Sequence, residues 1–343
     1  HIALPEYVKY FNPEATTQEV YMPATLSKYI LTDLLRGKMN FNGLVVTDAS
    51  HMVAMTSAMK RSEMLPTAIA AGSDLFLFFN DPDEDFQWMM DGYKNGIITD
   101  ERLEEALTRI LGTKAALGLH KKAKTEILPA KEEAMAKIGL EENKAIAKEV
   151  SDKAITLVKN TQDVLPIAPE KTKRVLLVEA KGFDGGFGKF IEIMGGAKKK
   201  PIEIVKELLE AKGFDVEIWE SPIDKIMKLP KEEMAQALGN VYAGKRPIAE
   251  LTSKYDLIIN IANVNASVDQ RLQWPPSKGT PDIPFYVNEI PTIFVSVKCP
   301  FHLADVPQVK TYINTYDDNQ QTLEALVEKL VGNSEFKGIS PVD

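Results

Sequence analysis

The chain has 343 residues, of which 44% are hydrophobic, and this length predicts two domains with sizeable cores. Its net charge is −8 with lysines and acids interspersed, so we expect no nucleic-acid partner and no binding to an anionic membrane surface. The single cysteine, Cys299, excludes an internal disulfide framework, and no apolar run approaches the roughly 18 residues that would span a bilayer. The compartment stays open, because one cysteine does not distinguish a cytoplasmic protein from a cysteine-poor exported one. The N-terminus shows no charged-then-apolar signal pattern.

The first third of the chain alternates predicted strands and helices. Residues 1–4 resemble the end of a strand, and the later strands are predicted at 44–47 and 73–79. Helices are predicted at 23–36, 62–71, 83–95 and 100–118, with Gly37, Gly72 and Gly96 ending the first three. This alternation is typical of parallel α/β units.

One short strand in this region ends on a carboxylate. Residues 44–47 are apolar or β-forming, which predicts a strand buried on both faces, and Asp48 follows directly. The carboxyl ends of parallel strands are where α/β enzymes place catalytic groups, so Asp48 is the first candidate for chemistry. The alternative is that Asp48 caps the helix that follows.

The second half of the chain predicts another parallel sheet. Residues 121–150 are charged and mostly helical, as in a linker that lies along the surface between domains. A helix at 144–158 precedes five short apolar strands separated by helices, and a last helix is predicted at 320–331. The strands are predicted at 173–180, 215–219, 256–262, 291–297 and 309–314. This order indicates a doubly wound, mainly parallel sheet.

A glycine cluster at 182–188 follows the first of these strands. It invites a dinucleotide-binding interpretation, but the third glycine of that motif is missing at the required offset and no partner acid is identifiable. A plain flexible loop is the alternative.

Several motifs resemble, in order and spacing, glycoside hydrolase family 3. They are Gly43–Asp48 (GLVVTD), Ala71–Leu75 (AGSDL), Asn95–Ile98 (NGII), Ile155–Asn160 (ITLVKN) with Leu165–Ile167, and Phe336–Val342. The resemblance implies an α/β protein in which residues 1–120 are the C-terminal portion of a (β/α)8 TIM-type barrel. Residues 121–150 are then a helical linker, and 151–343 a doubly wound α/β sandwich domain.

Within the family, two segments look most like the bacterial β-N-acetylhexosaminidases, namely Cys299–Pro307 (CPFHLADVP) and Pro23–Ser27. The resemblance makes Asp48 the nucleophile of an exo-acting retaining glycosidase. The enzyme is expected to release terminal β-linked N-acetylglucosamine from cell-wall or chitin-type glycans. A proton donor, roughly 5 Å away, has to protonate the leaving group. No cofactor and no metal are expected, because these two groups supply the chemistry.

The proton donor is not identifiable in this sequence. In this branch the resemblance implies a His paired with an Asp on a barrel loop that would precede His1. His51 is too close in sequence to Asp48 to reach the leaving oxygen freely, so a loop or helix-start role is favoured. His1 and Met52 are predicted to line the sugar pocket, with packing as the alternative for each.

These observations predict that roughly 150 to 200 residues of barrel precede His1 in the complete enzyme, as one chain or as an associated fragment. The 343 residues alone are then expected to be inactive. Three alternatives stay open: a phosphorolytic family member, a β-glucosidase in which Glu289 stands in as the acid, and a non-catalytic carbohydrate-binding scaffold.

Overall fold

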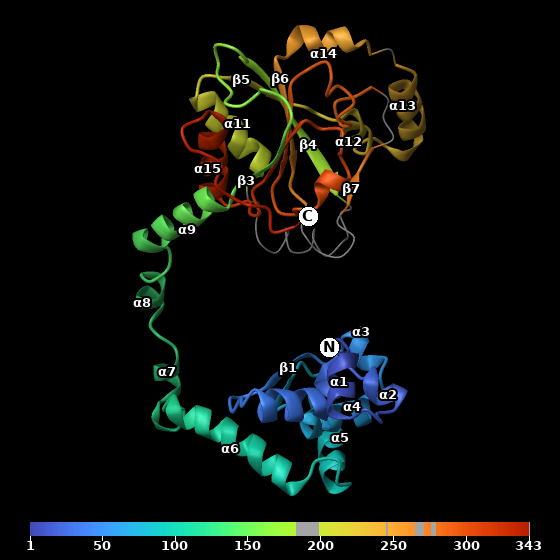
Figure 1. Ribbon diagram of the computed structural model, residues 1–343, viewed down its shortest axis with the longest axis vertical. Coiled ribbons are helices and arrows are strands. Elements are labelled where there is room, and N and C mark those ends of the chain that lie inside the picture. Colours follow the sequence, from blue (N-terminus) through green and yellow to red (C-terminus); the bar gives the residue numbers. More distant parts are fainter. Residues whose placement is uncertain (183–198, 245, 265–270, 276–278, 343) are drawn as a thin grey trace. The chain divides into compact units, whose positions relative to one another are not determined.

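The computed structural model describes residues 1–182, 199–244, 246–264, 271–275 and 279–342. The chain divides into two compact units, His1–Ala134 and Met135–Asp343. Figure 1 labels most of the helices and several of the strands. Within the described ranges, no helix combines the length and the apolar character that crossing a membrane requires.

The first unit is built around two parallel strands, β1 (Val46–Ala49) and β2 (Leu75–Leu77). Val46 lies opposite Leu75, and Ala49 lies opposite Leu77. The helical segments are α1 (Pro5–Phe11), α2 (Thr17–Val20), η1 (Ala24–Leu26), η2 (Tyr29–Lys38), α3 (Val53–Thr56), α4 (Arg61–Ala71), α5 (Pro82–Lys94), α6 (Asp100–Ala116) and η3 (Leu119–Lys121).

The ends of these helices follow from local chemistry. The side chain of Asp81 accepts the backbone N–H groups of Asp83 and Glu84 and caps α5, and Thr99 caps α6 in the same way. Gly72 ends α4 with a φ of +132°, a conformation that a side chain would resist. The predicted helices from 62 to 118 are therefore confirmed to within a few residues.

The strands differ from the prediction. β1 is as long as predicted but begins and ends two residues later, and β2 is shorter, with three residues. Burial on both faces is wrong: Val46, Leu75 and Leu77 are 43%, 38% and 39% exposed. The other face of β2 is covered, because Phe76 packs against a core that includes Met64 of α4. The exposed side chains have no covering layer within this unit, and this leaves an apolar strand face open.

The start of the chain also differs from the prediction. Residues 1–4 form no strand, and Ala3 makes only an isolated antiparallel bridge with Pro23. The helix expected at 23–36 is split into η1 and η2, and η2 continues one residue past Gly37.

Residues 121–150 contain the short helices α7 (Lys124–Ile127) and α8 (Lys131–Met135) and the beginning of α9 (Glu141–Ala154). The boundary between the two units falls inside this range, after Ala134. The division into a barrel part (1–120), a linker (121–150) and a sandwich domain (151–343) stays a prediction.

The second unit contains a sheet with the strand order β3-β9-β8-β6-β4-β5, and β7 pairs with β4. All pairs along this order are parallel except β3 with β9, and β7 is antiparallel to β4. The strands are β3 (Thr156–Asn160), β4 (Arg174–Gly182), β5 (Asp215–Ile218), β6 (Leu257–Ala262), β7 (Leu272–Gln273), β8 (Thr292–Ser296) and β9 (Thr311–Asn314).

Helices cover both faces of this sheet. Val175 and Leu177 of β4 face a core shared with α11 (Pro201–Ala211) and α15 (Gln320–Leu330), whereas Leu176 and Val178 face a second core on the opposite side. Figure 1 shows α11 and α15 together on one side of the sheet. The remaining helices are α12 (Pro222–Ile226), α13 (Lys231–Ala243), α14 (Ile248–Lys254) and η4 (His302–Ala304). The doubly wound arrangement predicted for this half is therefore confirmed.

The entry into this sheet differs from the prediction. The helix predicted at 144–158 is wrong at its end, because α9 stops at Ala154 and the β-branched residues that follow form β3 against β9. Of the glycine cluster considered as a nucleotide loop, residues 183–188 lie outside the described part of the chain.

Candidate active site

Asp48 lies at the carboxyl end of β1, one residue before the strand ends, and is exposed. Its Oδ1 accepts the backbone N–H of Ala49 at 2.7 Å. The neighbouring Thr47 is buried and ties this strand to β2: its Oγ1 accepts the N–H of Leu77 at 2.9 Å and donates to the Asp48 carbonyl at 2.8 Å. The backbone that carries Asp48 is thus fixed while its carboxylate remains accessible.

The alternative role of Asp48 as a helix cap does not fit this geometry. The next helix, α3, begins at Val53, and its N-cap residue is Met52, without a side-chain hydrogen bond to the cap. Asp48 is four residues too early for that position. Capping of α3 therefore does not explain why a carboxylate stands at position 48.

His51 and Met52, the two nearby side chains considered from the sequence, follow the end of β1. The N–H of Met52 donates to the Ala49 carbonyl at 3.1 Å, and Met52 is partly exposed. His51 is exposed, and its ring centroid lies 6.4 Å from that of Phe78, just after β2. The sequence prediction that Met52 lines a sugar pocket stays a prediction.

His1 belongs to another group of contacts. Its Nδ1 lies 2.8 Å from Oγ1 of Thr25, and Nε2 is buried without a hydrogen-bond partner among the described residues. The chain around it is held by the Ala24 N–H, which donates to the Ile2 carbonyl at 2.8 Å. Its predicted place in the sugar pocket also stays a prediction.

A buried ion pair lies at the same edge of β1 and β2 and was not anticipated from the sequence. Arg61, the first residue of α4, contacts Asp85 in the first turn of α5 through two hydrogen bonds, Nε to Oδ1 at 3.0 Å and Nη2 to Oδ2 at 2.6 Å. The Asp85 side chain is 1% exposed. An arginine opening one helix and an aspartate in the first turn of another give no sequence signal of pairing, because nothing local relates two residues that are 24 positions apart.

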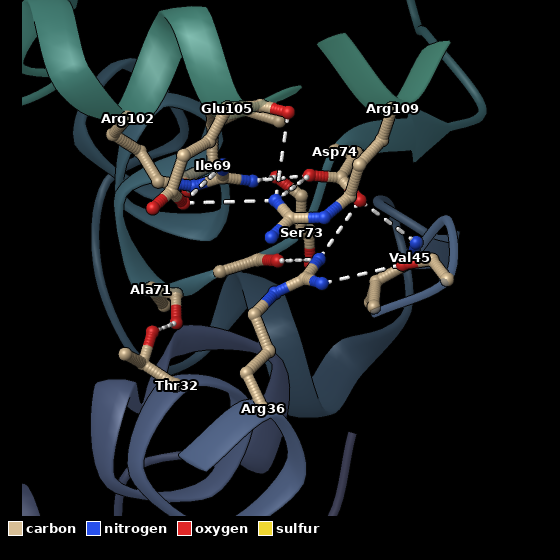
Figure 2. A network of polar contacts seen from close by, with 12 residues as sticks. Thr32, Arg36, Val45, Ile69, Ala71, Ser73, Asp74, Arg102, Glu105 and Arg109 are labelled. Carbon is tan, nitrogen blue, oxygen red and sulfur yellow. Dashed lines mark hydrogen bonds and ion pairs between the residues drawn. The ribbon is translucent and has the colours of Figure 1, made fainter. Parts of the chain in front are cut away.

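A second cluster of charges lies at the opposite end of the strands. Asp74, just before β2, accepts hydrogen bonds from Arg36 and Arg102, and Figure 2 shows these side chains converging. Burial lowers the pKa of the Arg36 guanidinium, although the Asp74 carboxylate opposes this shift. A cleft of about 610 Å³ also lies at this end, lined by residues 42–44 and α6. This end is therefore separated from Asp48 by the length of β1.

The other side chains considered from the sequence lie elsewhere. Glu289 is an exposed residue of the second unit, in a turn where its N–H donates to the Tyr286 carbonyl. Within the described ranges, no three His, Cys, Asp or Glu side chains are grouped so as to hold a metal ion.

Comparison with known proteins finds a matching family domain and several similar glycosidases. Residues 5–113 match the domain described as glycosyl hydrolase family 3 N terminal domain. The chain is 37% identical to a beta-N-acetylglucosaminidase/beta-glucosidase of Cellulomonas fimi over 347 aligned positions, covering 100% of this chain and 56% of that protein. A beta-hexosaminidase of Chromobacterium violaceum is 40% identical over 62 residues, which are 18% of this chain and 17% of that protein.

Among solved structures, a beta-glucoside phosphorylase is 38% identical and superposes with a TM-score of 0.81, covering 100% of this chain and 56% of that one. The chain thus spans just over half the length of these two full-chain relatives. The likeness confirms the predicted fold class, a portion of a TIM-type barrel followed by an α/β sandwich.

Proposed function

This chain belongs to glycosyl hydrolase family 3, and from that premise we propose that Asp48 is the catalytic nucleophile of a retaining β-glycosidase. The observation that carries the proposal is the exposed carboxylate at the carboxyl end of a parallel strand, with its backbone fixed and no capping role.

The proposed reaction has two steps. A carboxylate oxygen of Asp48 forms a bond to the anomeric carbon of the sugar while an acid protonates the departing glycosidic oxygen. In the second step the acid's conjugate base takes a proton from water, and the water oxygen displaces Asp48 from the sugar. The exposed position of Asp48 suits this role, because a sugar must approach the carboxylate directly.

We propose terminal β-linked N-acetylglucosamine of cell-wall or chitin-type glycans as the substrate. Support comes from the names of two relatives, a beta-N-acetylglucosaminidase/beta-glucosidase and a beta-hexosaminidase. The first name also covers β-glucosides, so glucose in the same position is the competing substrate.

The proton donor and the rest of the sugar pocket are proposed to come from a further segment of barrel. The exposed apolar face of β1 and β2, formed by Val46, Leu75 and Leu77, supports this. Such a face is normally covered in a closed barrel. The two relatives are also longer than this chain, which covers 56% of each, so they contain further sequence that could form such a segment.

The test uses the intact gene product and chromogenic β-N-acetylglucosaminide and β-glucoside substrates. We expect the N-acetylglucosaminide to be cleaved with the higher kcat/KM, and Asp48→Asn to lose roughly 10³-fold or more in kcat. Asp81→Asn, which changes a cap at a neighbouring helix, is the matched control and should retain kcat. Full turnover by Asp48→Asn would contradict the proposal, and no turnover by the wild type on either substrate would favour the carbohydrate-binding scaffold.

A second candidate is phosphorolysis, favoured by the beta-glucoside phosphorylase among the solved structures. Here phosphate replaces water in the second step and leaves with the sugar as a sugar 1-phosphate. The two are separated by running the reaction with and without inorganic phosphate. Sugar 1-phosphate that rises with phosphate concentration supports phosphorolysis, whereas free sugar at an unchanged rate supports hydrolysis.

A further inference from the structure

The ion pair of Arg61 and Asp85 is connected to the strand end that carries Asp48. Arg61 donates to the Ser50 carbonyl at 3.3 Å through Nη1 and to Ser50 Oγ at 3.0 Å through Nη2. Ser50 is the second residue after Asp48 and is 2% exposed. One guanidinium therefore holds both a buried carboxylate and the main chain next to the candidate nucleophile.

The same cluster holds the end of β2. Ser50 donates its hydroxyl to the Phe78 carbonyl and its N–H to the Leu77 carbonyl, the latter at 2.7 Å. Asp85 accepts the N–H of Asn80 at 3.1 Å through Oδ2. The two loops that leave β1 and β2 are thus fixed to each other through Ser50, Arg61 and Asp85, which we call the strand-end cluster.

The orientation of the Asp48 carboxylate depends on this main chain. Its Oδ1 accepts the N–H of Ala49, the residue between Asp48 and Ser50. A displacement of Ser50 would therefore carry the Ala49 amide, and with it the carboxylate, to a new position. Reacting groups lose about 100-fold in rate when they are misplaced by about 1 Å.

We propose that Arg61 and Asp85 are positioning residues for the nucleophile, acting through Ser50. This rests on the proposed function of Asp48. Neither residue touches the sugar in this proposal: Asp85 orients the Arg61 guanidinium through the two-point contact, and Arg61 fixes Ser50 against the end of β2. The cluster thus holds the attacking carboxylate at the geometry that the reaction needs.

A purely structural ion pair is the alternative, and the molecule offers a matched control. Asp74 is also fully buried and paired with arginines, but it lies at the amino end of β2, away from Asp48. Both aspartates should matter for stability, because each leaves buried arginine charge unpaired when removed. Only Asp85 should matter for the reaction of correctly folded molecules.

The experiment compares Asp85→Asn, Asp74→Asn, Ser50→Ala and Asp48→Asn in the intact gene product. Unfolding midpoints in urea are measured beside kcat and KM, and kcat is expressed per folded molecule. We expect both Asp85→Asn and Asp74→Asn to lower the midpoint. Asp85→Asn should lower kcat about 10- to 100-fold with KM changed less than about 2-fold, and Asp74→Asn should leave kcat within about 2-fold.

Ser50→Ala keeps the ion pair and removes only the hydroxyl between Arg61 and Phe78, so it covers the case in which Asp85→Asn does not fold. It should fold and lower kcat several-fold. Equal kcat losses per folded molecule in the Asp85 and Asp74 variants, or an unchanged kcat in Ser50→Ala and Asp85→Asn, would show that the pair is only structural. A fully active Asp48→Asn variant would overturn both the proposed function and the positioning role. If Asp48→Asn is inactive but the Asp85→Asn and Ser50→Ala variants keep the wild-type kcat, only the positioning role is overturned.

Discussion

Arg36 of η2 and Arg102 of α6 donate to the two oxygens of a single buried carboxylate, that of Asp74 (Figure 2). The Arg36 contact is 2.8 Å long and the Arg102 contact is 2.5 Å. Asp74 also accepts the N–H of Val45 at 3.0 Å, and Arg109 lies 3.5 Å from it. Through these hydrogen bonds, Asp74 connects η2 and α6 to the residue just before β1, at the amino end of the two strands.

This arrangement predicts a large loss of stability in Asp74→Asn. The variant leaves buried arginine charge without its counter-ion, which costs about 3 to 5 kcal/mol in the free energy of unfolding. Urea denaturation of the intact gene product measures the loss. Asp83→Asn, an exposed aspartate in the first turn of α5, is the matched control and should cost less than about 1 kcal/mol. Similar losses in the two variants would show that the burial of Asp74 is not what matters.

Two glycines inside helices predict opposite effects of the same substitution. A Cβ on Gly92 of α5 would collide with the ring of Pro66 in α4, whereas a Cβ on Gly112 of α6 would meet no atom within 4 Å. Gly92→Ala should therefore destabilise the protein by about 1 to 3 kcal/mol through overpacking. Gly112→Ala should stabilise it by about 0.5 to 1 kcal/mol, because only the helix propensity changes.

Thermal or urea unfolding of the two glycine variants provides the comparison. Since both substitutions gain the same helix propensity, the difference between them isolates the close contact of α4 with α5. A stabilised Gly92→Ala variant would mean that these helices can separate at no cost.

The sequence predicts the helices and the parallel sheet of the second unit well, because periodic apolar residues and caps are local signals. Thr99 capping α6 and Gly72 ending α4 are examples. The same reasoning places Asp48 at a strand end, since a carboxylate after an apolar run is visible in the sequence. The position of β3 was missed because a helix and a β-branched run adjoin without a break at Ala154.

What the sequence does not show is which distant charges meet. Arg61 and Asp85 are 24 positions apart, and Arg36 and Asp74 are 38 apart. Nothing in their local patterns distinguishes them from exposed residues at helix ends. Likewise, the exposure of Val46 could not be predicted from its apolar surroundings, because it depends on which segments cover β1 and not on β1 itself.

The ion pair between Asp152 of α9 and Lys329 of α15 predicts that the free energy of unfolding depends on pH. Hydrogen bonds from Ser334 and then Lys329 lower the pKa of the Asp152 carboxyl. Lys329 Nζ lies 2.9 Å from Oδ1 of Asp152, and the Lys329 side chain is buried. A carboxyl whose pKa is lower in the folded state than in the unfolded chain stabilises the fold above its unfolded pKa of about 3.9. That stabilisation is lost as the pH falls through the lower, folded pKa.

Asp152→Asn should therefore cost about 1 to 2 kcal/mol at pH 7, a value that allows for the partial exposure of the carboxyl. The difference from the wild type should shrink as the pH falls below about 4. Urea unfolding at a series of pH values measures it, and Glu149→Gln, an exposed partner of Lys153 on the same helix, is the control. A difference that stays constant from pH 7 to pH 3 would rule out the charge of Asp152 as its source.

The proposed role of Asp48 also predicts the stereochemistry of the first product. If its carboxylate attacks the anomeric carbon and is then displaced, the configuration inverts twice, so a β-linked substrate should release a sugar that is initially β. Time-resolved NMR of the anomeric proton, recorded before mutarotation equilibrates the product, distinguishes the two outcomes in the intact gene product. An initially α sugar would mean that water attacks the substrate directly. The carboxylate at the end of β1 would then act as a base that activates this water, and a single displacement would replace the covalent step.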